Sequence, residues 1–157
     1  MKPAARPSID EILERTERLT AMSEEDLFPR AAALADEFLD AGEAIVETWL
    51  DAKDAVPTGK RSEGFRLLAL HRQAARGDPS FNACRETCRE IVYCRNLIHS
   101  DPDGPAVGRQ VRLGAMVVRH LALFIGGKLE TAGLGEFCCS ARPIRQSEPA
   151  GSFTGNA

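Results

Sequence analysis

The sequence predicts an all-α protein, an antiparallel bundle of four to five helices with a flexible tail at each end. Apolar residues recur at steps of three and four in the long segments, helix caps precede them, and Pro- and Gly-rich breakers separate them. A chain of 157 residues is long enough for one domain with its own core. We expect a disordered lead-in over residues 1–7, one helical domain over 8–137 and a flexible tail over 138–157.

Capping signals and apolar spacing predict the helices of the N-terminal third. Ser8 and Glu11 have the spacing of a capping box, in which each side chain bonds the other residue's amide, so a helix should run from there to about residue 20. A second box at Ser23 should start another turn. The main helix of this region is expected over residues 29–53, with Pro29 at its beginning and Trp49 on its apolar face.

The opposite side of the predicted helix over residues 29–53 is acidic. Its carboxylates recur at helical spacing and form what we term the acidic strip: Asp36, Asp40, Glu43, Glu47, Asp51 and Asp54. Residues 1–56 carry a net charge of −8 and residues 57–128 a net charge of +6, within a total of −3. A solvated outer face is the ordinary interpretation of such a strip. The functional interpretation is a docking surface for a basic partner, formed by Asp36, Asp40, Glu43 and Glu47.

Residues 62–99 have the pattern of two helices joined by a tight turn. Ser62 is a candidate N-cap for the first helix, and Gly77 is a candidate left-handed residue at its end. Asp78 and Pro79 should then start the second helix, which we extend to residue 99. A break this short predicts an antiparallel hairpin.

A helix-turn-helix DNA-binding regulator is an alternative interpretation of the same stretch. Asn82 and Arg85 lie where a recognition helix would expose base-reading side chains. Glu86 and Glu90 interrupt the positive charge of that helix, and the whole chain is negatively charged. Both observations argue against nucleic acid as the partner.

The final helix is expected over residues 106–125, after a breaker at 100–105. Gly114 on its apolar stripe should allow another helix to approach closely, and Gly126-Gly127 should end it before an irregular segment. Its remaining side forms what we term the basic strip: Arg109, Arg112, Arg119 and His120. The three arginines are candidate contacts for a partner, and the wide apolar face of this helix would also allow a homodimer.

Five cysteines are the other chemical feature of the chain. Cys84 and Cys88 are one helical turn apart, whereas Cys94 lies roughly 15 Å from Cys84 along the helix axis, too far to share one metal ion. Buried cysteine on an apolar face is the ordinary interpretation. The alternative is a thiol-redox, zinc or iron–sulfur site formed by Cys84 and Cys88 and completed by His71, Cys138 or Cys139.

The function that the sequence favours is a small cytosolic accessory or regulatory protein that binds another protein and is not an enzyme. We assign no catalytic residue and expect no cofactor, with zinc and iron–sulfur as the alternatives above. No apolar run is long enough to span a membrane. An odd number of cysteines without a secretory signal indicates a reducing compartment such as the cytosol.

Overall fold

The computed structural model describes residues 5–134, which form an all-α bundle, as the sequence predicts. Five helices have 12 or more residues: α1 (Ile9–Ala21), α3 (Ala31–Ala52), α4 (Arg66–Gly77), α5 (Arg85–Ser100) and α6 (Val107–Ala132). A short helix α2 (Glu24–Leu27) and two 3₁₀ helices, η1 (Phe28–Arg30) and η2 (Pro79–Cys84), join them. The tail predicted over 138–157, with Cys138 and Cys139, lies outside the described residues.

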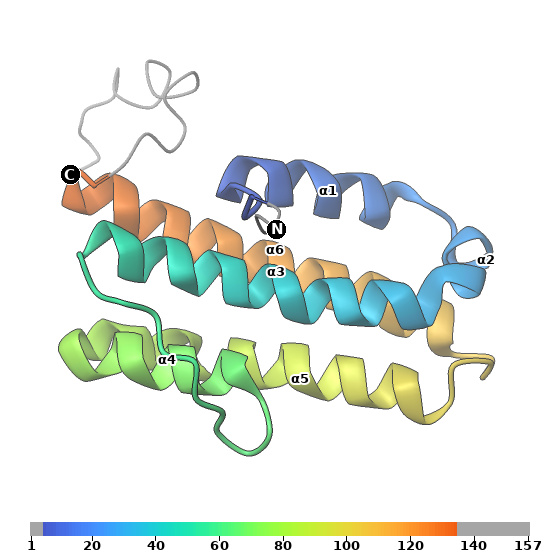
Figure 1. The fold of residues 1–157 in the computed structure, drawn as a ribbon. Coiled ribbons are helices and arrows are strands. Elements are labelled where there is room, and N and C mark those ends of the chain that lie inside the picture. The colour runs from blue at the N-terminus through green and yellow to red at the C-terminus, as the bar shows by residue number, and fades with distance from the viewer. Residues whose placement is uncertain (1–4, 135–157) are drawn as a thin grey trace, which may run out of the picture.

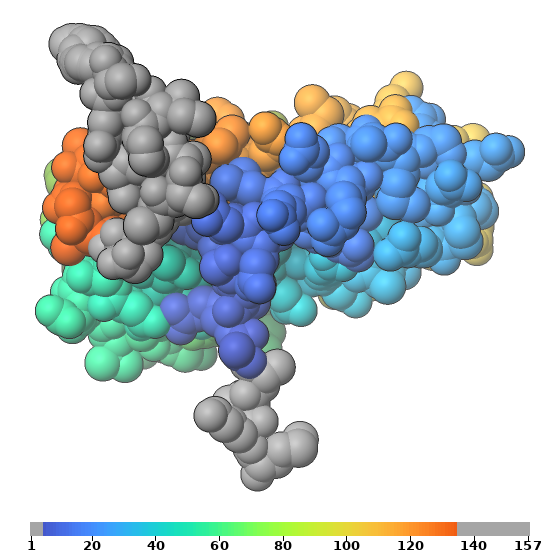
Figure 2. Space-filling model, turned by 90° about the horizontal axis from the view of Figure 1, so that it is seen from above, coloured from blue at the N-terminus to red at the C-terminus, as the bar shows by residue number. Residues whose placement is uncertain are grey.

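The helices are arranged around the long pair α3 and α6. Figure 1 shows α1 on one side of this pair and the α4–α5 hairpin on the other. Figure 2, viewed from the side of α1, shows α1 outermost with α6 beside it. Ile45 and Trp49 of α3 and Leu121 and Ile125 of α6 are buried in the core between them. Of the described helices, none has the length and apolar content that a bilayer crossing requires.

The predicted caps of the first two helices are confirmed. The Ser8 hydroxyl accepts from the Glu11 amide at 3.0 Å, and the Ser8 amide donates to the Glu11 carboxylate at 2.8 Å. Ser23 accepts from the Asp26 amide at 3.0 Å. These bonds satisfy amides that have no acceptor inside the helix, which is why both helices begin there.

The prediction that Ser62 caps α4 is wrong. Ser62 and Phe65 instead exchange two backbone hydrogen bonds of 3.0 Å across a tight turn. Both residues between them have positive φ, 54° at Glu63 and 87° at Gly64, as turns of this kind require. The turn moves the helix start to Arg66, and the Ser62 hydroxyl accepts a hydrogen bond from Arg72 instead.

The end of α4 also differs from the prediction. Gly77 belongs to the last turn and does not adopt a left-handed conformation. The chain leaves the helix at Asp78, whose extended backbone (φ −155°, ψ 95°) is the geometry favoured before a proline. Asp78 then accepts from the Ser80 amide at 3.1 Å, as predicted, but the turn that follows is 3₁₀ over Pro79–Cys84.

The final helix continues through Gly126-Gly127 to Ala132, so the predicted end there is wrong. Each glycine costs a helix about 1 kcal/mol, but the apolar stripe continues to Leu129, which is buried in the core. The helix ends at Gly133, whose φ of 71° is left-handed. The predicted close approach at Gly114 is confirmed, because a Cβ there would lie 2.8 Å from the Phe38 ring.

Candidate functional site

The acidic strip is largely paired with cations of the same chain. Arg66, at the start of α4, binds Glu47 at 2.5 Å and Glu43 at 3.3 Å. Arg6 binds Glu47 at 3.3 Å and Asp51 at 2.6 Å. The carboxylates of the acidic strip therefore hold Arg6 and the start of α4 against α3.

Asp36 and Asp40 occupy the other end of this strip. The Asp36 carboxylate lies 2.8 Å from Nε2 of His99 and 3.6 Å from the Arg95 guanidinium, both on α5. Asp40 forms no ion pair among residues 5–134. Partial burial and the nearby charges of Asp36 and Glu37 raise its pKa. Of the four acidic residues predicted to bind a partner, three thus have partners inside the molecule.

The basic strip differs from the acidic one. Arg112 donates to the Met22 carbonyl at 2.6 Å and pairs with Glu24 at 3.2 Å, which ties α6 to α2. Arg109 and Arg119 lie on the same helix as Arg112, but they form no ion pair among the described residues. The predicted arginine contacts therefore divide into Arg112, which has an internal partner, and Arg109 and Arg119, which have none within residues 5–134.

Apolar side chains lie beside these two arginines on the outer face of α6. Leu113, Met116 and Leu123 are 48%, 51% and 48% exposed. Their spacing of three and seven residues places them on one side of the helix. The sequence alone did not identify Leu113, Met116 or Leu123 as members of an exposed surface. The sequence signal for this exposed surface was that Met116 and Leu123 share a helix face with polar residues.

A groove between α5 and α6 borders this outer face. It has a volume of about 350 Å³, and its wall is formed by Thr87, Glu90, Leu113, Met116, Val117 and His120. Most of these side chains come from α6, and Leu113 and Met116 are shared with the exposed face. The exposed apolar residues therefore line a concave surface.

The structure brings His71, Cys84 and Cys88 together in the core beside Phe81. His71 is 5% exposed, Cys84 is 2% exposed and Cys88 is fully buried. The His71 Nε2 donates to the Phe81 carbonyl oxygen at 2.7 Å, and the Cys84 thiol lies 3.3 Å from the same oxygen. Phe81 lies within the 3₁₀ helix Pro79–Cys84, and its carbonyl oxygen is within reach of both side chains.

The hydrogen bonds of this cluster change the acidity of its thiols. A hydrogen bond from Cys88, aided by His71 and opposed by burial, lowers the pKa of Cys84 to about 6. The same contact with Cys84, together with burial, raises the pKa of Cys88. Burial lowers the pKa of His71, but hydrogen bonds to Cys84 and Phe81 outweigh it and raise that pKa overall. Cys84 is thus the more acidic thiol of the pair.

Metal binding is the other chemistry that these side chains suggest. Across residues 5–134, no three His, Cys, Asp or Glu side chains are arranged to hold a metal ion. Cys138 and Cys139, the other ligands predicted for such a site, lie beyond the described part of the chain. A metal or cluster site that includes them stays a prediction.

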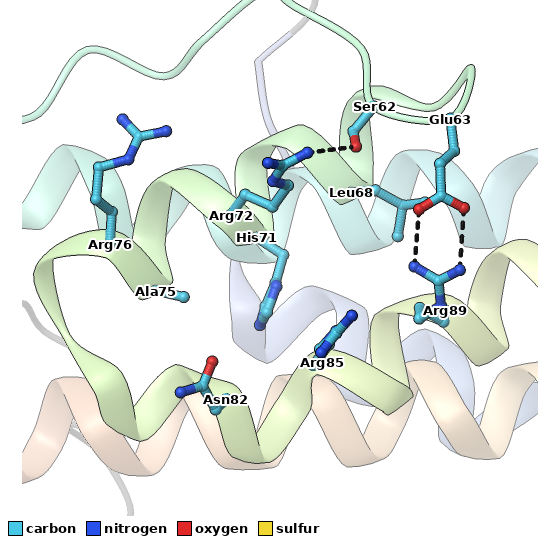
Figure 3. Close-up of a pocket in the computed structure, with 10 residues that line it drawn as sticks. All are labelled: Ser62, Glu63, Leu68, His71, Arg72, Ala75, Arg76, Asn82, Arg85 and Arg89. Carbon is cyan, nitrogen blue, oxygen red and sulfur yellow. Dashed lines mark hydrogen bonds and ion pairs between the residues drawn. The ribbon is translucent and has the colours of Figure 1, made fainter.

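A basic pocket of about 540 Å³ opens between α4 and the beginning of α5 (Figure 3). Arg72 and Arg76 come from α4, and Arg85 and Arg89 come from α5. Figure 1 shows α4 running antiparallel to η2 and the first turns of α5. The hairpin thus has the predicted antiparallel arrangement, and Asn82 and Arg85, the residues considered as base readers, line its pocket.

No protein-family model, no curated protein and no solved structure matches this chain. Its function therefore has to be inferred from its own residues and contacts.

Proposed function

We propose that this chain is a small accessory or regulatory protein of the cytosol, which acts by binding another protein and performs no catalysis of its own. The outer face of α6 is the proposed contact surface. The observation that carries this proposal is the alignment of three exposed apolar side chains, Leu113, Met116 and Leu123, with Arg109 and Arg119, which form no ion pair among residues 5–134. Exposed apolar patches beside unpaired charge are typical of protein-binding surfaces.

The chemistry of this face favours an acidic amphipathic helix as the partner segment. Apolar side chains of such a helix would enter the groove beside Leu113 and Met116, as in helix-in-groove recognition. Its carboxylates would meet Arg109, Arg119 and His120 at the rim. A second copy of this chain is a poorer occupant, because two identical faces would bring like charges together.

Charge reversal on α6 tests the proposal. The variant Arg109→Glu/Arg119→Glu should bind the native partner about tenfold more weakly at low salt, since two ion pairs are lost. The control Lys60→Glu/Arg61→Glu reverses two charges on the loop before α4 and should bind normally. The partner segment, mapped by cross-linking, should be acidic and amphipathic. An equal loss of affinity for the partner in both variants, or no loss of affinity in either, would contradict the proposal.

A thiol-dependent regulator is the second candidate function. It is supported by the low pKa of Cys84, which lies beside His71 and Cys88. As pH rises through about 6, the thiolate absorbance of Cys84 should appear, and the difference spectrum between wild type and Cys84→Ser isolates it from the other thiols. The variant His71→Asn should move this transition to higher pH. A Cys84 signal that appears only at the pH of an ordinary thiol would remove this candidate.

A further inference from the structure

The basic pocket between α4 and α5 has no role in the proposed function, and its lining is unusual. Both helices place two arginines one turn apart beside the same hollow: Arg72 and Arg76 on α4, Arg85 and Arg89 on α5. Like charges at this spacing destabilise a helix. Four guanidinium groups in one pocket therefore need a compensating negative charge.

Glu63 is the one acidic side chain in the lining of this pocket. It is bound to Arg89 through two parallel hydrogen bonds of 2.9 and 3.0 Å. Among residues 5–134, the Arg72 guanidinium donates only to the neutral Ser62 hydroxyl, at 3.1 Å. Arg76 and Arg85 form no ion pair within the described part of the chain. Three of the four guanidinium groups thus have no bonded carboxylate in the part of the chain that the structure describes.

The floor of the pocket is formed by buried side chains and is partly apolar. Leu68 and His71 are 7% and 5% exposed, and the hydrogen bond to Phe81 fixes the imidazole ring. Figure 3 shows the His71 ring reaching from α4 into the hollow, with Arg85 and Asn82 on the opposite side of it. A rigid floor with converging polar groups is the usual form of a small-molecule site.

The positive charge extends into a second hollow of about 440 Å³. The two hollows share Ser62, Arg72 and Arg76, and the second adds Lys60 and Arg61 from the loop before α4. Arg72 and Arg76 therefore border both spaces. An anion with charge at more than one position fits this arrangement better than a single carboxylate.

We propose that the basic pocket binds a small molecule carrying a pyrophosphate group, with Arg85 and Arg72 as its principal contacts and Arg76 as a contact in the second hollow. Guanidinium groups bind phosphate oxygens through two parallel hydrogen bonds, which favours arginine over lysine at such sites. A pyrophosphate supplies two linked groups of oxygens for the two hollows. This inference is independent of the surface on α6.

Calorimetric titration of the full chain with inorganic pyrophosphate tests the proposal. Wild type should bind saturably, and Arg72→Gln/Arg85→Gln should bind about a hundredfold more weakly, because two charge-assisted contacts are lost. The variant Arg76→Gln should bind pyrophosphate about tenfold more weakly than wild type, because one charge-assisted contact is lost. The control Arg109→Gln/Arg119→Gln removes the same charge from α6 and should bind like wild type.

Further variants and ligands distinguish specific binding in this pocket from non-specific electrostatic binding. The variant Arg72→Lys/Arg85→Lys keeps the charge without the planar fork and should bind with intermediate affinity. Absence of saturable binding, or equal weakening in the pocket variant and the α6 control, would overturn the proposal. Pocket-dependent binding of a DNA duplex without pyrophosphate binding would also overturn it. Tighter binding of a nucleoside diphosphate than of pyrophosphate would identify a nucleotide as the source of the group.

Discussion

The outer face of α3 and the outer face of α6 carry opposite charge and use it in different ways. On α3, Glu43 and Glu47 bind Arg66, and Asp36 lies against His99 and Arg95. On α6, the guanidinium groups of Arg109 and Arg119 have no ion pair among residues 5–134, and exposed apolar side chains lie beside them. Charge that is paired inside the fold positions helices, whereas unpaired charge beside apolar surface is available to a partner.

The largest expected effect concerns the orientation of α6. Leu121 is fully buried and Leu123, two residues away, is 48% exposed. The variant Leu121→Ala should lower the free energy of unfolding by about 2–5 kcal/mol through a core cavity. The variant Leu123→Ala should change it by less than about 1 kcal/mol. Urea unfolding of both variants checks the difference, and a similar loss in both would mean that the outer face of α6 is covered.

The next effect concerns the cations that face the acidic strip. The side chains of Arg66, Glu43 and Glu47 are only 28%, 21% and 17% exposed. The variant Arg66→Met leaves the carboxylate of Glu43 without its cation and that of Glu47 with Arg6 alone, and should cost about 1–3 kcal/mol. The matched variant Arg109→Met should change stability by about 0.5 kcal/mol or less. Equal effects in urea unfolding would remove the distinction between the two strips.

The smallest effect concerns Asp40, the member of the acidic strip without an ion pair in residues 5–134. Its raised pKa means that the folded state disfavours the carboxylate, so ionisation destabilises the fold at neutral pH. The variant Asp40→Asn should gain about 0.2–0.5 kcal/mol near pH 7, because it removes a partly buried charge and its repulsion from Asp36 and Glu37. Below the ordinary pKa of 3.8 the gain should vanish, because both states are then protonated. Unfolding curves at the two pH values measure this, and a loss of stability near pH 7 would contradict it.

Local patterns were enough to predict the fold. The first two helices begin with signals that act within a few residues, such as the Ser8–Glu11 box, and the apolar spacing predicts which helix faces are buried. Errors occurred where a distant contact outweighed a local preference. Leu129 is buried in the core, and α6 continues through Gly126-Gly127 to include it. The turn at Glu63-Gly64 places the start of α4 after Phe65, so Ser62 is not its N-cap.

The candidate sites were harder to predict because they join residues far apart in the chain. Arg66 meets Glu43 and Glu47 across a loop, and nothing within the acidic helix itself indicates this pairing. His71 and Cys84 meet only because the α4–α5 hairpin is antiparallel and its turn is 3₁₀. Spacing along one helix predicts which residues share a face, but not what lies opposite that face.

Photo-crosslinking from two positions tests the central difference between the faces most directly. A photoreactive amino acid replaces Met116 on α6 in one version of the chain and Asp40 on α3 in the other, under the same conditions. We expect Met116 to capture an acidic amphipathic segment of another protein, with a yield that falls as salt increases, and Asp40 to capture none of it. Capture of the partner from Asp40, or capture of a second copy of this chain from Met116, would contradict the account.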